Sequence, residues 1–513
     1  MKSEKIYDAI TNIDDELIEC SDSYKFKKKK NKSIQVIISA AAAFIIIVAI
    51  GFIIRDFDFE ASNSKNENIT QSQGVTENNK ENNNTQTDNS VITAPQGASQ
   101  MSLVSALYPE RTKYPIEDER FQYNTDEYEK WYDEDKERSN IDFDDESINS
   151  FSFKLINEML TGKEGENKAA SPLNIYMALC VLAETCGGES REQILSLLGA
   201  SSIEQLRDTA KKVWLKNYRN DGVMRSILAN SIWLSDGFEY NKDTLELISN
   251  NYYASSFKGK MGSPEYNQML NFWISQQTDG LLNPNIEMAP ETLLCIASTL
   301  LFNSKWNEEF SPENTEKGIF NAPAGEKEVE YMKKTQSMQY FFGDKFSAVY
   351  LNLDIGGKMW FILPDEGVSA DSIFADNEVQ KLITTDFSGL WQYENSKDIR
   401  VNVSIPKFDV ECKTDLIENL KNLGVTDITD SSVSDFSPLC GKNSKVFVDK
   451  AEHGVRVKAD EEGISAAAYT VIMECGSTMP PDEIVDFTLD RPFAFAITFD
   501  NDTILFAGVV NNP

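Results

Sequence analysis

The sequence is short of histidine and has no cysteine pairs of the kind that bind zinc. His453 is its one histidine, and no two cysteines are separated by two residues. The seven cysteines are odd in number and scattered, which does not suit a disulfide framework: Cys20, Cys180, Cys186, Cys295, Cys412, Cys440 and Cys475. The H-E-x-x-H, G-x-S-x-G, Walker A and dinucleotide-binding motifs are also absent. We therefore expect no metal, no cofactor and no enzymatic activity.

Positive charge is scarce as well. The 513 residues include 49 Lys and Arg against 82 Asp and Glu, which gives a net charge of -33. Such a chain repels a phosphate backbone, so we expect no binding to nucleic acid. Apolar residues make up 41% of the sequence. This length and composition allow one large domain with appendages, or two to three average domains.

One long apolar run lies near the N-terminus, at residues 33–54. Its only polar residues are Ser33, Gln35 and Ser39, and its length suits the ~30 Å hydrocarbon core of a bilayer. A buried core helix or a cleaved signal peptide fits less well, because no small-residue cleavage site follows. Six lysines precede the run between residues 25 and 32, whereas Arg55 alone follows directly. The positive-inside rule then predicts a single-pass signal-anchor in the cell membrane, with a cytoplasmic N-terminus and an extracellular C-terminal part.

Three segments of different composition surround this span. Residues 1–32 form a cytoplasmic stub in which Ile6, Ile10, Ile13 and Leu17 share one helical face. Residues 55–100 predict a flexible stalk, because 61–100 contain no aromatic residue and nine Asn fall between 63 and 89. Residues 101–147 are acidic and rich in aromatic side chains, which indicates a partly ordered lead-in that docks on the main domain.

From residue 148 to residue 513 the chain reads as one continuous globular unit. Helical patterns occur at its start, over 151–160, 175–183 and 191–198. Strand-like runs then dominate, at 226–234, 293–302, 347–352, 358–364, 400–406, 445–457 and 493–510. The order of these patterns predicts an α+β fold with a large sheet system.

The most informative segment begins at Asp460. A glycine is followed by a run of small residues, then by a strand-capable stretch that ends in Pro480 and Pro481. This composition suits a segment that is a loop in one state and a strand in another. The segment resembles the hinge of the reactive-centre loop of serpins, at residues Glu461, Glu462, Gly463, Ile464, Ser465, Ala466, Ala467 and Ala468.

The resemblance to serpins extends over nearly all of residues 148–513. It rests on several separate strings in the family's order. These are Ser171-Pro172-Leu173-Asn174-Ile175, Asn271-Phe272-Trp273-Ile274, Phe302-Asn303-Ser304-Lys305-Trp306, Ile362-Leu363-Pro364, Ile405-Pro406-Lys407-Phe408 and the C-terminal Phe506–Pro513. The resemblance implies a large central sheet with two further sheets, about nine helices and an exposed reactive-centre loop.

The same resemblance implies structural roles for a few buried polar residues. It places His453, Ser171, Asn174 and Ser298 in the shutter beneath the central sheet, where they control its opening and perform no catalysis. Ser298 stands where the family commonly has Asn. Trp306 matches the tryptophan of the breach at the top of the sheet, and a large core aromatic residue is the simpler interpretation of the same position.

The resemblance implies inhibition of serine proteases by a suicide-substrate mechanism. The protease cleaves the loop and forms an acyl-enzyme, and the freed arm inserts into the central sheet before water releases it. Two residues depart from the family's pattern. Ile464 replaces the usual Thr or Ser after the hinge glycine, and Tyr469 is larger than usual. A non-inhibitory serpin that acts as an extracellular sensor or binding domain of a membrane signalling protein therefore stays an alternative.

Counting along the loop predicts that the reactive bond joins Ser477 and Thr478. The bonds Cys475–Gly476 and Met473–Glu474 remain candidates. No Lys or Arg occurs between residues 459 and 490, so the expected targets are elastase-like or subtilisin-like proteases with apolar or permissive pockets. We expect a monomer. The Asn-rich stalk and the uncleaved anchor favour a bacterial source.

Overall fold

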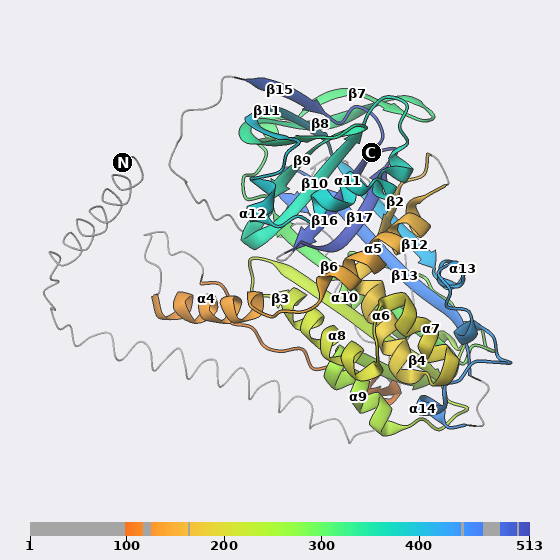
Figure 1. The fold of residues 1–513 in the computed structure, drawn as a ribbon. Helices are drawn as coiled ribbons and strands as arrows, with labels where there is room; N and C mark the ends of the chain where they lie inside the picture. Colours follow the sequence, from red (N-terminus) through yellow and green to blue (C-terminus); the bar gives the residue numbers. More distant parts are fainter. Residues whose placement is uncertain (1–97, 116–124, 163–164, 443–445, 465–482, 500–501) are drawn as a thin grey trace, which may run out of the picture. The chain divides into compact units, whose positions relative to one another are not determined.

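The computed structural model describes residues 98–115, 125–162, 165–442, 446–464, 483–499 and 502–513 (Figure 1). The predicted stub at 1–32, the span at 33–54 and the stalk up to residue 97 lie outside the described residues. Within the part of the chain that is described, no helix has both the length and the apolar composition that a membrane crossing requires.

The first sheet has eight strands and contains the segment that resembles the loop hinge. Its order is β1-β5-β4-β6-β14-β13-β12, with β3 paired to β4. The strands are β1 Ser102–Val104, β3 Arg219–Asn220, β4 Arg225–Ser235, β5 Ala254–Gly259, β6 Leu294–Lys305, β12 Phe408–Asp415, β13 Val448–Ala459 and β14 Gly463–Ile464. Residues 226–234 of β4 are buried without interruption, as a strand covered on both faces requires.

The second sheet has nine strands in the order β15-β11-β8-β9-β10-β16-β17-β2, with β7 paired to β8. They are β2 Lys168–Ala170, β7 Glu316–Ala322, β8 Gly325–Phe342, β9 Phe346–Asn352, β10 Gly357–Pro364, β11 Ser396–Pro406, β15 Ile484–Thr488, β16 Phe493–Phe499 and β17 Thr503–Val510. The expected run at 493–510 is thus two strands. Asp502, just before β17, has a left-handed φ of 59°, which fits a turn that reverses the chain.

The expectation of two further sheets beside the central one needs a correction. Strand β8 is long enough to pair with β7 and β11 and then to turn back into β9. Only the pairs Phe341–Ala348 and Phe342–Ser347 join β8 to β9. This short ladder unites the two smaller sheets into one, so the described residues form two sheets and not three.

The described residues also contain more helices than the nine expected. The α-helices are α3 Ala98–Met101, α4 Thr125–Ser139, α5 Asp145–Leu160, α6 Pro172–Thr185, α7 Gly188–Leu198, α8 Ile203–Asn217, α9 Lys242–Tyr252, α10 Pro264–Gln277, α11 Asn377–Ile383, α12 Phe387–Leu390, α13 Ile417–Asn422 and α14 Ser437–Cys440. Four short 3₁₀ helices are η1 Pro312–Asn314, η2 Asp354–Gly356, η3 Ala370–Ala375 and η4 Asp427–Thr429. The short helices α11 to α14 lie between strands, where the apolar pattern is too brief to be recognised.

Helix α6 forms the centre of the main core. Every one of its residues is buried, and Pro172 occupies its first turn, where a missing N–H costs nothing. Figure 1 shows α6 among α5, α7, α8 and α9, alongside β4 and β6. Helix α6 packs against β4 and β6, so it covers one face of the first sheet.

Candidate functional site

Strands β6 and β13 are neighbours in the lower half of the first sheet and separate in its upper half. They pair in parallel from Leu294 and Val448 up to Thr299 and Gly454. Because β6 and β13 run in the same direction, a strand placed between them can be antiparallel to both. Above Thr299 the direct pairing between these two strands stops.

The two residues of β14 occupy the upper end of this opening. Gly463 pairs with Lys305 and Ile464 pairs with Ser304 of β6, while Ile464 also pairs with Ala459 of β13. A Cβ atom at Gly463 would lie 2.4 Å from the Ser304 carbonyl oxygen, so a larger residue cannot approach β6 as closely. The Ile464 side chain is 2% exposed and belongs to the main apolar core.

Hydrogen bonds around Trp306 hold the chain that leads into β14. The Trp306 Nε1 donates to the carbonyl oxygen of Asp460 at 2.8 Å, and its backbone N–H donates to Glu462 at 3.1 Å. The backbone N–H of Phe310 donates to the carbonyl oxygen of Glu461 at 3.0 Å. Trp306 therefore fixes the hinge at the top of the opening and is not only a large core side chain.

The side chain of Glu461 adds a second attachment. It accepts a hydrogen bond from Thr315 at 2.8 Å and pairs with Lys407 at 2.7 Å. Burial opposes ionisation of Glu461, but the hydrogen bonds from Lys407 and Thr315 lower the pKa of this carboxyl below its usual value. Lys407 is the one residue between β11 and β12, so this pair connects the hinge to the junction of the two sheets.

The predicted shutter residues meet just below the opening, where β6 and β13 still pair directly. His453 of β13 lies opposite Ser298 of β6. The His453 Nε2 accepts a hydrogen bond from the Ser171 backbone N–H at 3.2 Å, and the Ser298 hydroxyl donates to the Asn174 carbonyl oxygen at 3.2 Å. Both β6 and β13 are thus tied to the N-terminal end of α6.

Sequence reasoning missed Asn230 of β4, which completes this row. Asn230 lies opposite Ser298, so Asn230, Ser298 and His453 stand side by side on three adjacent strands. Its side chain is 1% exposed. Its neighbours in 226–234 read as an ordinary buried strand, and the one available signal was an amide side chain in a run whose other polar residues are Ser226 and Ser231.

Several buried polar atoms in this region have no hydrogen-bond partner among the described residues. They are the hydroxyl oxygens of Ser171 and Thr299, both amide atoms of Asn174 and of Asn230, and the Nδ1 of His453. A buried polar group without a partner costs about 1–3 kcal/mol. Complete burial also lowers the pKa of His453 to about 4. The shutter is therefore a polar cluster with more hydrogen-bond donors and acceptors than partners while β6 and β13 are paired to each other.

The remaining predicted site residues lie outside the described residues. This holds for the hinge residues Ser465, Ala466, Ala467 and Ala468, and for the candidate reactive bonds within Met473, Glu474, Cys475, Gly476, Ser477 and Thr478. The described chain resumes at Glu483, and β15 then pairs in parallel with β11. The segment 465–482 therefore connects the top of the first sheet to the edge of the second.

A sequence model of one family matches residues 146–513, which is most of the chain. That family is described as Serpin (serine protease inhibitor). The chain is a serpin. The members of this family are generally protease inhibitors.

Relatives with this fold come from distant organisms. Serpin-ZX of Arabidopsis thaliana is 28% identical over 392 residues, which cover 71% of this chain and 97% of the relative. Human neuroserpin is 26% identical, with coverage of 72% and 92%. Among solved structures, the thermophilic serpin tengpin in its native state is 25% identical, with a TM-score of 0.64 and coverage of 72% of this chain and 95% of tengpin.

Proposed function

We propose that this serpin is a suicide-substrate inhibitor of extracellular serine proteases. One observation carries the proposal. Gly463 and Ile464 already pair between β6 and β13, at the top of an opening that continues downward between two parallel strands. A cleaved arm that continues this pairing becomes a full central strand and carries an attached protease with it.

The pairing register predicts where the arm would reach. Each step along the arm moves one residue back along β6 from Ser304 and one residue back along β13 from Ala459. Six steps beyond Ile464 bring Thr470 opposite both Ser298 and His453, which face each other in the present structure. Because side chains alternate between faces, Thr470 would share the inward face of Ile464, whereas Tyr469 would face outward.

Insertion at this register would bring new hydrogen-bond partners to the buried polar atoms of the shutter that have none among the described residues. The Thr470 hydroxyl would enter the polar cluster of Ser171, Asn174 and His453, and the arm would supply backbone partners to β6 and β13. From Gly463 to Ser477 the arm would span roughly 46 Å at about 3.3 Å per residue. The native fold is then metastable, and a kinetic barrier keeps it from inserting the uncleaved loop.

The loop sequence supports elastase-like or subtilisin-like targets. Cleavage at Ser477–Thr478 would leave a small residue on the acyl side, and no cation is present between residues 459 and 490. A protease with a buried carboxylate in its specificity pocket therefore finds no partner for it. The apolar run at 33–54, with its lysine-rich flank, supports a single-pass anchor that displays the inhibitor on the outer face of a bacterial membrane.

Incubation with elastase, subtilisin and trypsin tests this function. We expect an SDS-stable adduct with elastase or subtilisin, and a released C-terminal peptide that begins at Thr478. Peptides that begin at Gly476 or Glu474 would shift the bond within the predicted range. Cleavage without an adduct for every protease would support the alternative, a non-inhibitory serpin that acts as an extracellular sensor. Strong trypsin inhibition would contradict the predicted register of the loop.

A further inference from the structure

Residues 98–115 and 125–139, which we call the strap, precede the region that matches the serpin family. They include α3, β1 and α4, and they dock on the serpin domain at two separate places. One anchor lies on the edge of the first sheet, and the other joins β3 of the first sheet to the second sheet. This arrangement bears on how the first sheet opens.

The first anchor is strand β1, which covers the edge of the first sheet. Val104 pairs with Ser256 of β5. The same row continues through Ile232 of β4 to Ile296 of β6 and Ala451 of β13. Strand β1 therefore lies at the level where β6 and β13 still pair directly, and where the sheet must open for the arm to enter.

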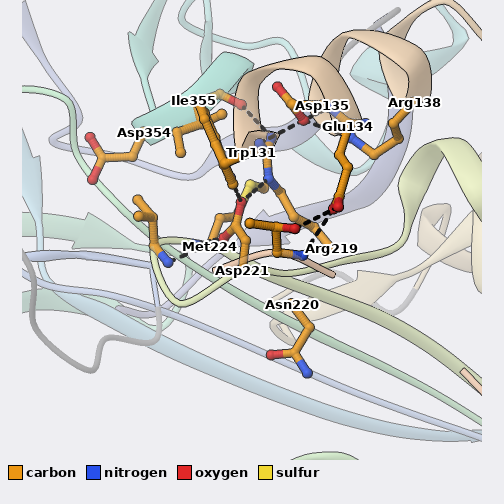
Figure 2. A network of polar contacts seen from close by, with 12 residues as sticks. Trp131, Glu134, Asp135, Arg138, Arg219, Asn220, Asp221, Met224, Asp354 and Ile355 are labelled. Carbon is orange, nitrogen blue, oxygen red and sulfur yellow. Dashed lines mark hydrogen bonds and ion pairs between the residues drawn. The ribbon is translucent and has the colours of Figure 1, made fainter. Parts of the chain in front are cut away.

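The second anchor is a buried ion network around Arg219 (Figure 2). The Arg219 guanidinium lies 2.6 Å from Asp221 and 2.7 Å from Asp135 of α4, and it donates to the carbonyl oxygen of Ile355 at 3.5 Å. The Trp131 Nε1 of α4 also donates to Asp221, at 3.1 Å. Arg219, Asp221 and Trp131 are each at most 8% exposed.

Arg138 extends this anchor onto the second sheet. Its guanidinium lies 2.9 Å from Asp135 and stacks 5.2 Å from the ring centre of Phe499 in β16. Ile355 belongs to η2, between β9 and β10 of the same sheet. Asp135 of α4 thus binds two arginines, one from α4 and one from β3 of the first sheet, and both arginines also contact the second sheet.

Hydrogen bonds connect the two anchors to each other. The backbone N–H and the hydroxyl of Thr112 donate to Glu134 of α4 at 2.9 and 2.5 Å. Between them, Tyr108 packs on Trp214, with ring centres 5.3 Å apart. Because Thr112 is bonded to Glu134, we expect α4 to move together with β1 when β1 is displaced.

Insertion of the arm requires movement at the second anchor, where the first sheet contacts the second. A new strand must separate β6 from β13 by about 4.8 Å. Strands β12 and β13 cannot move far from the second sheet, because Lys407 alone separates β12 from β11. The β6, β4 and β5 side therefore slides and takes β1 with it. Strand β3 is paired to β4 and moves with it, so the contacts of Arg219 with Ile355 and of Arg138 with Phe499 would not survive such a displacement.

We propose that the strap restrains the opening of the first sheet. It raises the barrier to insertion of the uncleaved loop, and its contacts are released when the cleaved arm inserts. This inference rests on the proposed function, because it assumes that the arm enters between β6 and β13.

The test uses the full chain with Asp135→Asn, which removes the carboxylate shared by the two arginines. Asp133→Asn is the matched control, because Asp133 is exposed on the same helix. On incubation at elevated temperature, the uncleaved Asp135→Asn protein should lose its ability to form an adduct about tenfold faster than the control, a change of about 1.4 kcal/mol in the barrier.

Thermal unfolding of the loop-cleaved proteins separates this effect from general damage. The cleaved Asp135→Asn protein should unfold at the same temperature as the cleaved wild type, because insertion has already released the strap. An equal loss of stability in the cleaved form, or an unchanged rate in the uncleaved form, would overturn the inference. A cleaved wild type that is no more stable than the uncleaved one would instead overturn the proposed function, and the inference with it.

Discussion

At the scale of single residues, the polar row of Asn230, Ser298 and His453 crosses three adjacent strands of the first sheet. His453, Ser298, Ser171 and Asn174 could be grouped in advance, because the resemblance to serpins carries the shutter with it. Asn230 could not be added to this group in advance. The sequence of a strand does not show which residue of another strand will lie in the same row, and His453 is two strands away from Asn230. Buried polar clusters of this kind depend on strand register, which is set by the whole sheet.

A residue-scale prediction concerns Gly463. Gly463→Val should prevent β14 from pairing with β6, because a Cβ atom there would lie 2.4 Å from the Ser304 carbonyl oxygen. The variant should be cleaved by the target protease but should trap at least tenfold less of it. Gel densitometry of adduct against cleaved serpin measures this ratio. Gly237→Ala is the control, because its nearest atom would be 3.6 Å away, and equal trapping by both variants would contradict the prediction.

A second residue-scale prediction concerns pH. Burial lowers the pKa of His453 to about 4 in the folded protein, against about 6.5 when unfolded. Between these values the unfolded chain binds a proton that the folded protein does not, so stability is lost as the pH falls from about 6.5 to 4. The full loss is on the order of 3 kcal/mol.

Urea unfolding of the wild type and of His453→Gln at pH 7 and pH 4.5 measures this contribution. The wild type should lose more stability than the variant between the two conditions. Other titrating groups, such as Asp354, whose pKa burial raises to about 6, act equally in both proteins and cancel in the comparison. An identical loss in the two proteins would show that His453 is not the source.

At the scale of elements, the long strands and the core helices could be predicted, but their pairing could not. The run at 226–234 became β4 with one residue added at each end, and 175–183 became the middle of α6. The union of the smaller sheets through β8 and β9 was missed, because it depends on two residue pairs at a hairpin. The strap was foreseen only as a docked lead-in, since the ion pairs of Arg219 join residues far apart in the chain.

An element-scale prediction concerns the fate of the arm after cleavage. If 463–475 becomes a central strand, cleavage in the loop should raise the unfolding temperature instead of lowering it. Ile464→Arg should abolish this gain, because Ile464 is 2% exposed in the apolar core and an arginine there would bury an unpaired charge. Calorimetry of intact and cleaved protein, wild type and variant, provides the measurement. A variant that gains as much stability as the wild type would contradict insertion at this register.

At the scale of the whole molecule, the charge of the chain and its predicted anchor have to be considered together. A net charge of -33 keeps the domain away from an anionic membrane surface, and the six lysines before residue 33 are confined to the other side of the predicted span. The stalk from residue 61 up to residue 97, just before α3 begins, would span an r.m.s. distance on the order of 35 Å if it behaves as a random coil. An inhibitor attached in this way would meet proteases in the medium without lying on the lipid.

The membrane topology that follows from the lysines on one flank of the predicted span can be tested on intact cells. The lysine-rich flank predicts that residues 1–32 are cytoplasmic and that the serpin domain is outside. Subtilisin added to intact cells should cleave the reactive-centre loop and spare an epitope tag placed at residue 1. Replacing the lysines at 25, 27, 28, 29, 30 and 32 with glutamine, and adding lysines after Arg55, should reduce or reverse this pattern. A loop that is protected in intact cells and cut only after lysis would show that the serpin domain faces the cytoplasm, where its targets would have to be intracellular proteases.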